Sequence, residues 1–345
     1  MNHQKTTIRD IAKEAGVSAM TVSYVLNQNP NQTISAATTQ KVLEAAKKLH
    51  YIPSSAAKAL RSRQTFCVGI VMSNPLSHHR YSQTIDGIRD SLERQKYNAL
   101  FCSNTIHQDN LPEYVYCYLQ HKIDGLIYIG ENGTDIPSDT QALLTKYHIP
   151  TVALDCRHAG VDISSVDFDY YNDAYCHASY LLEHGASRLL YLRPDMDSLQ
   201  EREREAGVKA ALSLHPDVTA DIRTIHHLKG NSPDGRASSS LYSFLDELIS
   251  IMQQTVPFMS ENDAILCSWG IYVEAVYASA AARTSRLQIG SLAEGPLNIR
   301  LWKNLSYTVH SHYEVGCHCA SLIIEKITSG TVRHEILDTS LIFSP

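Results

Sequence analysis

The first fifty residues place apolar side chains at the spacing of short amphipathic helices. One face of a first helix collects four of them: Ile8, Ile11, Ala12 and Ala15. We expect Thr7 to cap this helix together with Asp10, three residues on, in a variant of the capping box. Gly16 ends the helix, because glycine takes a positive φ angle at the least steric cost.

A second helix is expected to begin at Ser18, whose hydroxyl can cap it. Its inward positions are Val22, Val25 and Leu26, and its outward positions are Ala19, Met20, Ser23 and Tyr24. A third helix, capped near Ser35, closes a three-helix core. This pattern is typical of a helix-turn-helix, in which the second helix enters the major groove of DNA. It also fits a helical hairpin unrelated to nucleic acid.

From about Phe66 the pattern changes to short apolar runs separated by helical stretches such as 85–92 and 114–122. The runs read as buried parallel strands at 67–72, 98–102, 125–129, 151–154, 188–192, 222–225, 264–267 and 287–290. The length of this segment suggests two lobes. The alternation predicts doubly wound α/β lobes, where ligands bind beyond the carboxyl ends of the strands.

Charge separates the beginning of the chain from the rest. Residues 1–64 carry nine lysines and arginines against three acids, a charge of +6, whereas the remainder carries 21 against 33, or −12. The overall charge of −6 therefore hides a basic segment attached to an acidic one. Attraction to phosphate explains such a segment, because each neutralised phosphate releases counterions.

Residues 51–63 join a proline to a short basic helical pattern with little apolar surface to bury. Such a helix is marginal on its own. Its protruding Leu60 could wedge between base steps in the minor groove if the segment folds on DNA. A plain interdomain linker explains the same composition equally well.

Six motifs, in this order, resemble the lactose/galactose repressor (LacI/GalR) family of bacterial transcription regulators. They are IRDIA at 8–12, AGVS at 15–18, TVS at 21–23, VLN at 25–27, KVLEAA at 41–46 and YIP at 51–53. The resemblance implies an α/β fold class: an all-α helix-turn-helix headpiece at 1–53, a hinge helix or linker at 54–65, and a sensor at 66–345 for effector binding and dimerisation. The sensor is expected to be two-lobed, doubly wound α/β and similar to periplasmic sugar-binding proteins.

The outward face of the second helix and the resemblance together predict the DNA contacts. These are Thr7, Ser18, Ala19, Met20, Thr21, Ser23, Tyr24, Asn27, Ser54, Ala57, Lys58 and Leu60. Tyr24 departs from the family, which usually carries arginine at this position. A tyrosine cannot grip guanine with two hydrogen bonds as an arginine can. The resemblance therefore leaves the preferred operator sequence open.

The family pattern places effector contacts at strand ends and in one helix. The corresponding residues are Asn74, Leu76, Asp155, Arg204, Ser268, Trp269 and Glu294. An arginine and a carboxylate suit a polyol or an anionic metabolite, because charged groups form short hydrogen bonds to hydroxyls and acids. Without the family, an exposed salt bridge to Glu201, Glu203 or Glu205 would explain Arg204 as well.

Two segments of this expected site depart from the family. Ser268-Trp269 stands where many relatives have an Asn-Asp pair, and residues 290–293 (GSLA) replace a segment with two acids. Trp269 could stack on an apolar ring face, or it could fill the cleft and leave no site for a free sugar. Glu294 is a candidate replacement for the missing carboxylate.

The sequence offers no set of catalytic or metal-binding residues, although it has 17 histidines and 8 cysteines. It contains no Cys-x-x-Cys pair, His-Glu-x-x-His motif, Gly-x-Ser-x-Gly elbow or dinucleotide fingerprint. Cys317, His318 and Cys319 fall in an expected helix, where neighbouring side chains diverge by about 100°. We therefore expect neither an enzyme nor a cofactor.

The scattered cysteines are typical of small core residues in a reducing compartment rather than of a disulfide framework. The N-terminus has no apolar signal core, and no long apolar stretch predicts a membrane span. These features favour a cytoplasmic protein. They count against a secreted solute-binding protein, the second class of function considered, which would lack residues 1–65.

The sequence thus predicts a sequence-specific transcription regulator, most simply a repressor. Its partners would be double-stranded operator DNA, a small-molecule effector (a sugar or related metabolite) in the interlobe cleft, and a second copy of the chain, with no membrane. The effector would control operator affinity through its different affinities for two conformations. A homodimer is expected because one headpiece reads only half of a near-palindromic site.

Overall fold

The computed structural model describes residues 6–27, 33–52, 64–72, 76, 79–130, 136–156, 162–226, 244–280 and 287–344. The chain divides into two compact units, residues 1–65 and 66–345. Of the expected hinge helix or linker at 54–65, residues 54–63 lie outside the described residues.

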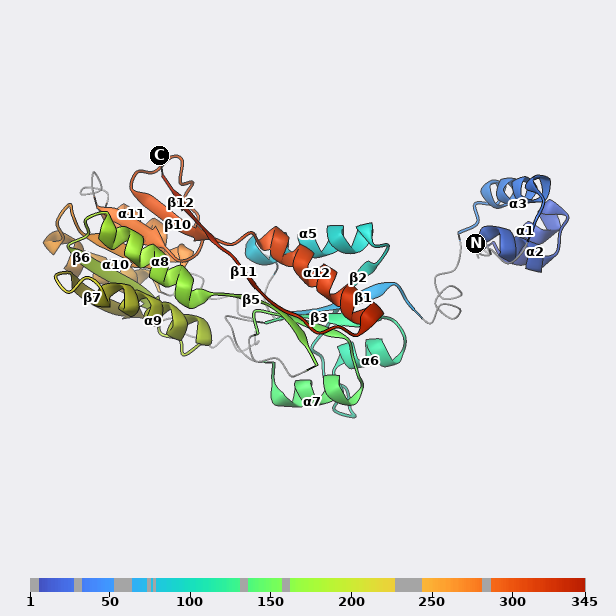
Figure 1. Ribbon diagram of the computed structural model, residues 1–345, viewed down its shortest axis with the longest axis horizontal. Coiled ribbons are helices and arrows are strands. Elements are labelled where there is room, and N and C mark those ends of the chain that lie inside the picture. The colour runs from blue at the N-terminus through green and yellow to red at the C-terminus, as the bar shows by residue number, and fades with distance from the viewer. Residues whose placement is uncertain are drawn as a thin grey trace. The chain divides into compact units, whose positions relative to one another are not determined.

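The N-terminal unit contains the three predicted helices, α1 (Ile8–Ala15), α2 (Ala19–Leu26) and α3 (Ala36–Lys48) (Figure 1). The predicted caps on Thr7, Ser18 and Ser35 are present, and each side-chain oxygen accepts a backbone N–H of the first turn. Gly16 has a φ of +68°, as the helix end requires. The three helices share one core: Ile11, Ala12, Val22, Val25, Val42 and Ala45.

The second unit contains two six-stranded sheets. We call each sheet with the helices that cover it a lobe, lobe 1 and lobe 2. The sheet of lobe 1 has the order β11-β5-β4-β3-β1-β2, and all its pairs are parallel. Its strands are β1 (Cys67–Met72), β2 (Asn98–Cys102), β3 (Gly125–Ile129), β4 (Thr151–Leu154), β5 (Ser164–Phe168) and β11 (His334–Leu337). Helices α5 (His79–Arg94) and α12 (His312–Ser329) pack on one face. Helices α6 (Glu113–Leu119) and α7 (Ser138–Lys146) cover the other face (Figure 1).

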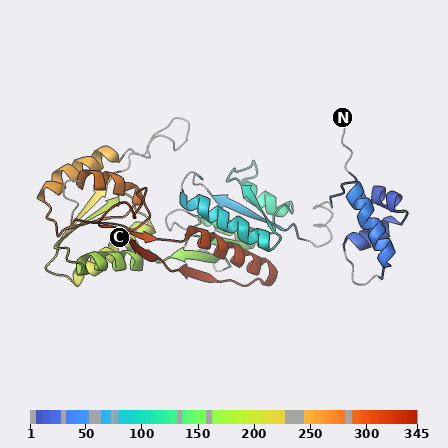
Figure 2. The ribbon, with the colours of Figure 1, turned by 90° about the horizontal axis from the view of Figure 1, so that it is seen from above.

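The sheet of lobe 2 has the order β12-β10-β9-β8-β6-β7, with only the β10–β12 pair antiparallel. Its strands are β6 (Arg188–Pro194), β7 (Thr219–Ile225), β8 (Ala264–Cys267), β9 (Gln288–Ser291), β10 (Leu305–Val309) and β12 (Ser340–Phe343). Helices α8 (Tyr170–Glu183) and α9 (Leu199–Ser213) lie on one face. Helices α10 (Leu245–Thr255) and α11 (Val273–Ala280) lie on the other, as Figure 2 shows, with short 3-10 turns η1 (Val256–Phe258) and η2 (Gly270–Tyr272) beside them.

The described chain passes between the lobes three times. It crosses between β5 and α8, between β10 and α12, and between β11 and β12. The C-terminal segment therefore supplies the edge strand β11 to lobe 1 and the edge strand β12 to lobe 2.

The predicted fold class is confirmed: a helix-turn-helix segment precedes two doubly wound lobes. All eight predicted strands are present, with ends that differ by up to three residues. Strands β5, β10, β11 and β12 were not predicted from the sequence. All four of these strands flank a crossing between the lobes.

Candidate nucleic-acid interface and effector site

The turn between α1 and α2 fixes the geometry of the predicted DNA-reading surface. Asp10 Oδ2 accepts the Thr7 backbone N–H at 2.8 Å and the Thr7 hydroxyl at 2.7 Å. These hydrogen bonds from Thr7 hold the pKa of Asp10 below its usual range. Ser18 Oγ accepts the Thr21 backbone N–H at 3.0 Å. Both helix starts are thus fixed by local hydrogen bonds.

The first turn of α2 presents small and apolar side chains to solvent. Ser18, Ala19 and Met20 are exposed, with Met20 at 63%. Thr21 is half-buried, and its hydroxyl lies 2.9 Å from Ser18 Oγ. This turn has no acidic side chain, so nothing on it repels a phosphate backbone.

The remaining predicted contacts on α2 are partly covered. Ser23 and Tyr24 are half-buried, and Asn27 is exposed at the C-cap. Asn27 Nδ2 donates to the Ser23 carbonyl at 2.5 Å. Four predicted contacts, Ser54, Ala57, Lys58 and Leu60, lie outside the described residues.

In lobe 2 the structure brings Arg204 and Ser268 together. Arg204 Nη1 donates to the Ser268 carbonyl at 2.9 Å, and Nη2 donates to the Leu292 carbonyl at 2.9 Å. The Arg204 side chain is only 3% exposed. An exposed salt bridge, the alternative left open by the sequence, therefore does not describe this arginine.

Glu201 is the centre of this cluster. Its carboxylate accepts the Ser268 hydroxyl at 2.7 Å and the Trp269 indole N–H at 3.0 Å, and it lies 3.6 Å from Arg204 Nη1. The Glu201 side chain is fully buried. Buried charges are tolerated when they are paired and hydrogen-bonded, as here. The donors expected to bind an effector are thus bonded to a carboxylate of the chain itself.

A second set of contacts continues from this cluster to lobe 1. The Arg204 guanidinium carbon lies 5.3 Å from the ring centroid of Tyr170, within the range of a cation–π contact. The Tyr170 hydroxyl donates to Asp155 Oδ1 at 2.6 Å. Burial, and then the Asp155 carboxylate, raise the pKa of Tyr170 well above its usual value. The Tyr170 phenol therefore remains a hydrogen-bond donor. Tyr170 links Asp155, through its hydroxyl, to Arg204, through its ring.

Of the described residues, the other two predicted effector residues, Leu76 and Glu294, form no hydrogen bond with this cluster. Leu76 is exposed, and Asn74 lies outside the described residues. Glu294 is exposed, and its backbone packs against Gly270: a Cβ added at Gly270 would lie 2.1 Å from the Glu294 carbonyl oxygen.

Two residues at the centre of the site, Glu201 and Tyr170, were not predicted as site residues. A sequence signal for Glu201 exists, because Ser198 lies three residues earlier in the spacing of a capping box. Ser198 Oγ does accept the Glu201 backbone N–H at 3.2 Å. The Glu201 carboxylate, however, turns into the protein to Ser268 and Trp269.

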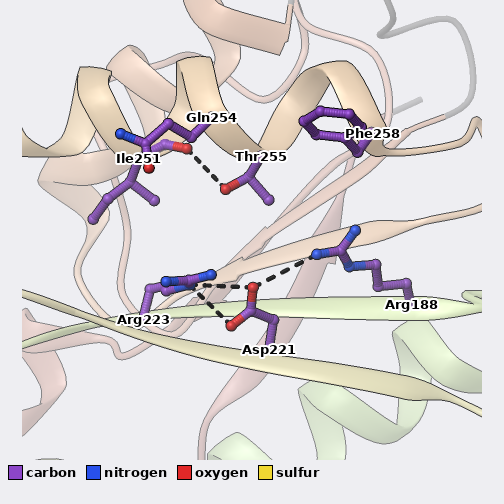
Figure 3. A pocket seen from close by; sticks show the side chains of 7 residues that line it. All are labelled: Arg188, Asp221, Arg223, Ile251, Gln254, Thr255 and Phe258. Carbon is purple, nitrogen blue, oxygen red and sulfur yellow. Dashed lines mark hydrogen bonds and ion pairs between the residues drawn. The ribbon is translucent and has the colours of Figure 1, made fainter.

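A cavity of about 200 Å³ lies elsewhere in lobe 2, between α10 and the β6–β7 edge (Figure 3). In it Asp221 lies between two arginines, 3.0 Å from Arg223 Nε and 3.6 Å from Arg188 Nη2. None of the predicted effector residues that the structure describes lines this cavity. Within the described ranges, no group of three or more His, Cys, Asp or Glu side chains could hold a metal ion.

Comparison with known proteins identifies the family. Residues 7–54 match the model for bacterial regulatory proteins of the lacI family, and residues 65–234 match that for periplasmic binding proteins and the sugar binding domain of the LacI family. The chain is 31% identical to catabolite control protein A of Staphylococcus xylosus over 72% of its own length and 74% of that protein. The chain belongs to the LacI family. It is a DNA-binding transcription regulator.

The chain is also similar to a further repressor and, in fold, to solved regulators. The HTH-type transcriptional repressor PurR of Vibrio atlanticus is 28% identical over 65% of each chain. Among solved structures, a Lac repressor dimer bound to operator and the anti-inducer ONPF has a TM-score of 0.75 over 98% of each chain, at 19% identity. A CelR–cellobiose complex has a TM-score of 0.60 at 18% identity. In the part of the chain that the structure describes, no helix is long and apolar enough to cross a membrane.

Proposed function

We propose that this LacI-family chain is a transcriptional repressor that binds operator DNA as a homodimer. The exposed start of α2 carries the proposal. Ser18, Ala19 and Met20 are exposed at the N-terminal end of the helix that a helix-turn-helix inserts into the major groove. The charge of the N-terminal segment supports it. The Lac repressor structure that this chain resembles is a dimer on its operator, and one headpiece reads only half of such a site.

A selection from randomised duplex DNA with the full chain tests this proposal. We expect enrichment of a two-fold symmetric site. Met20→Glu should weaken binding to it at least about tenfold, since a carboxylate would face the DNA. Leu43→Glu places the same charge on an exposed position of α3 and serves as the control. The proposed DNA-reading surface would be contradicted if no sequence were enriched. It would also be contradicted if Met20→Glu and Leu43→Glu lost equal amounts of DNA affinity.

We infer further that a small polar molecule, such as a sugar or related metabolite, acts at the Arg204 cluster by displacing Glu201. Three groups that suit such a ligand converge there, but Glu201 accepts from two of them and lies beside the third. An incoming hydroxyl or anion must therefore compete with a carboxylate of the chain. Glu201→Gln removes the charge of this competitor, so it should strengthen effector binding.

Trp269 provides the measurement. The chain has two tryptophans, so Trp302→Phe leaves Trp269 as the sole indole. We expect sugars or sugar phosphates that bind this variant to change the Trp269 emission, because displacing Glu201 breaks the indole hydrogen bond. A compound that binds by calorimetry without changing the emission would place the effector elsewhere.

The internal pairing also favours a second candidate, a sensor that no longer binds a free sugar. Intact operator binding, together with no binding of any sugar, sugar phosphate or nucleobase, would support this candidate. The known relatives are regulators, and we propose that this chain has no catalytic activity either. We also propose that it acts in the bacterial cytoplasm, because its DNA partner is there.

A further inference from the structure

A second cavity lies where the chain passes between the two lobes. It measures about 300 Å³ and is lined by residues of all three crossings. Phe168 comes from the end of β5, and His310 and Ser311 come from the segment between β10 and α12. Leu337 is the last residue of β11, and Asp338 begins the segment between β11 and β12. We call it the hinge cavity. The predicted effector residues in the described part of the chain do not line it.

The hinge cavity contains a buried imidazole with unused hydrogen-bonding capacity. Within the described residues, neither ring nitrogen of His310 has a hydrogen-bond partner, and the side chain is only 8% exposed. The nearest carboxylate oxygen, on Asp173, lies 3.6 Å from Nε2, which is beyond hydrogen-bond distance. Burial, and then the charges of Arg204, His312 and Arg80, lower the pKa of His310 to about 3. This neutral ring can therefore both donate and accept.

Acidic groups stand at the mouth of the same cavity. Glu314, in the first turn of α12, and Asp338, just after β11, both line it and are exposed. No hydrogen bond or ion pair involves either carboxylate among the residues that the structure describes. A third acid, Glu335, is already bonded to His318 Nδ1 at 2.7 Å. The mouth thus offers two unpaired negative charges.

The inner walls are apolar. Phe168 and Val315 are buried, and the Phe168 ring meets the His310 ring edge-on at 4.6 Å. Apolar walls suit the hydrocarbon part of a ligand, and an aromatic ring attracts a cation over its face. A bare metal ion would gain little from such walls, and the described residues form no cluster suited to one.

We propose that the hinge cavity is a second effector site, which takes a small organic ammonium ion with an aromatic or aliphatic stem. The ammonium group binds between the carboxylates of Glu314 and Asp338, and the stem packs against Phe168 and Val315. A ligand here touches all three connections between the lobes. It therefore favours the lobe arrangement to which it binds more tightly. Operator affinity changes according to the difference in ligand affinity between the two arrangements.

Calorimetry on the full chain tests the site with phenethylammonium chloride as the probe and 2-phenylethanol as its uncharged analogue. We expect saturable binding of the ammonium ion and none of the alcohol. The double variant Glu314→Gln/Asp338→Asn should weaken binding at least about fivefold, as expected for losing partly exposed charge pairs. Glu325→Gln, on α12 but paired with Arg333 away from the cavity, is the matched control and should bind as the parent does.

Operator binding is then measured with and without the probe. A change of about fivefold in operator affinity, absent in the double variant, would support a regulatory site. The inference is overturned by equal binding of the alcohol, by an unaffected double variant, by binding of Mg²⁺ or Ca²⁺ in place of the ammonium ion, or by binding that leaves operator affinity unchanged. Operator binding without any probe is measured separately. Failure of the second effector site would therefore leave the proposed repressor function intact.

Discussion

The indole N–H of Trp269 donates to Glu201 Oε1 at 3.0 Å, across 68 positions of the sequence. The same carboxylate accepts the hydroxyl of Ser268, the residue before Trp269. One buried side chain on α9 thereby holds the end of β8 in place. Because Arg204 is bonded to the same segment, the charge of Glu201 also balances a buried guanidinium.

Removing this carboxylate should strongly destabilise the sensor. Glu201→Ala leaves the Arg204 charge buried without its acid, and breaking a buried pair in this way costs about 3–5 kcal/mol. Urea unfolding followed by tryptophan fluorescence measures the loss, since both tryptophans lie in residues 66–345. Glu274→Gln, on the exposed side of α11, should change stability by less than about 0.5 kcal/mol. A similar small effect at both positions would mean that the Glu201–Arg204 pair contributes little.

A pair of glycines allows the two units to be perturbed separately. Gly16 and Gly330 end α1 and α12 with φ angles of +68° and +74°, and open space surrounds the position of a Cβ at both. Alanine at either should therefore cost about 1 kcal/mol through backbone strain alone. We expect Gly330→Ala to lower the unfolding midpoint seen by tryptophan fluorescence. Gly16→Ala should leave that midpoint unchanged and instead increase amide exchange in α1 and weaken DNA binding. A loss of sensor stability in Gly16→Ala would contradict this separation.

Tyr24 should determine part of the operator sequence. Arginine at this position can form two hydrogen bonds with guanine, which typically discriminate by about 1–3 kcal/mol, whereas tyrosine cannot. We expect Tyr24→Arg to enrich guanine at one position of each half-site in a randomised-site selection. Tyr24→Phe serves as the control for the loss of the tyrosine itself. An identical preferred site for the parent and the arginine variant would show that residue 24 does not read bases.

Buried histidines make the sensor less stable in mild acid. His177 is fully buried between the hydroxyls of Ser306 and Thr308, and burial lowers its pKa to about 3. In the unfolded chain this imidazole is protonated near pH 6.5, whereas in the folded chain it stays neutral down to about pH 3. The free energy of unfolding therefore falls as the pH drops from 6.5 toward 3. Between pH 7 and pH 5 this histidine alone should remove about 2 kcal/mol. His177→Gln cannot titrate and should lose less stability over this range in urea unfolding.

His226 provides a control of opposite sign. Its bond to Glu247 raises the pKa of His226, so it contributes stability below its unfolded pKa and loses it as the pH rises through the folded value. His226→Gln should therefore be more damaging at pH 6 than at pH 8. The same pH response in both variants would show that neither histidine controls it.

Local patterns in the sequence were sufficient to predict the headpiece. Thr7, Gly16 and Ser18 act through neighbours within a few residues, so their caps and turn follow from spacing alone. The buried parallel strands were predicted for a similar reason, because both faces of a strand such as β3 are covered and its sequence is continuously apolar. The strands that were not predicted carry polar residues. Strand β5 (SSVDF) is fully buried, yet it includes Ser165 and Asp167, which bond to each other at 2.7 Å.

The effector cluster was only partly predictable for a different reason. Arg204, Ser268 and Trp269 were selected by family position, and the structure does bring them together. Whether Arg204 is exposed or buried depends on Leu292 and Ser268, which lie 88 and 64 positions away in the sequence. Glu201 was considered only as an exposed neighbour of Arg204. Helical spacing cannot distinguish a carboxylate in solvent from one that accepts hydrogen bonds from residues distant in the sequence, such as Ser268 and Trp269 after β8.

The shared segment 334–343 makes both lobes vulnerable to the loss of the same few residues. A frameshift just before residue 334 would remove β11 and β12 together. Strands β5 and β10 would then become bare edges, able to pair with other chains and aggregate. We therefore expect neither lobe to fold as a separate fragment, because each takes an edge strand from residues 334–343.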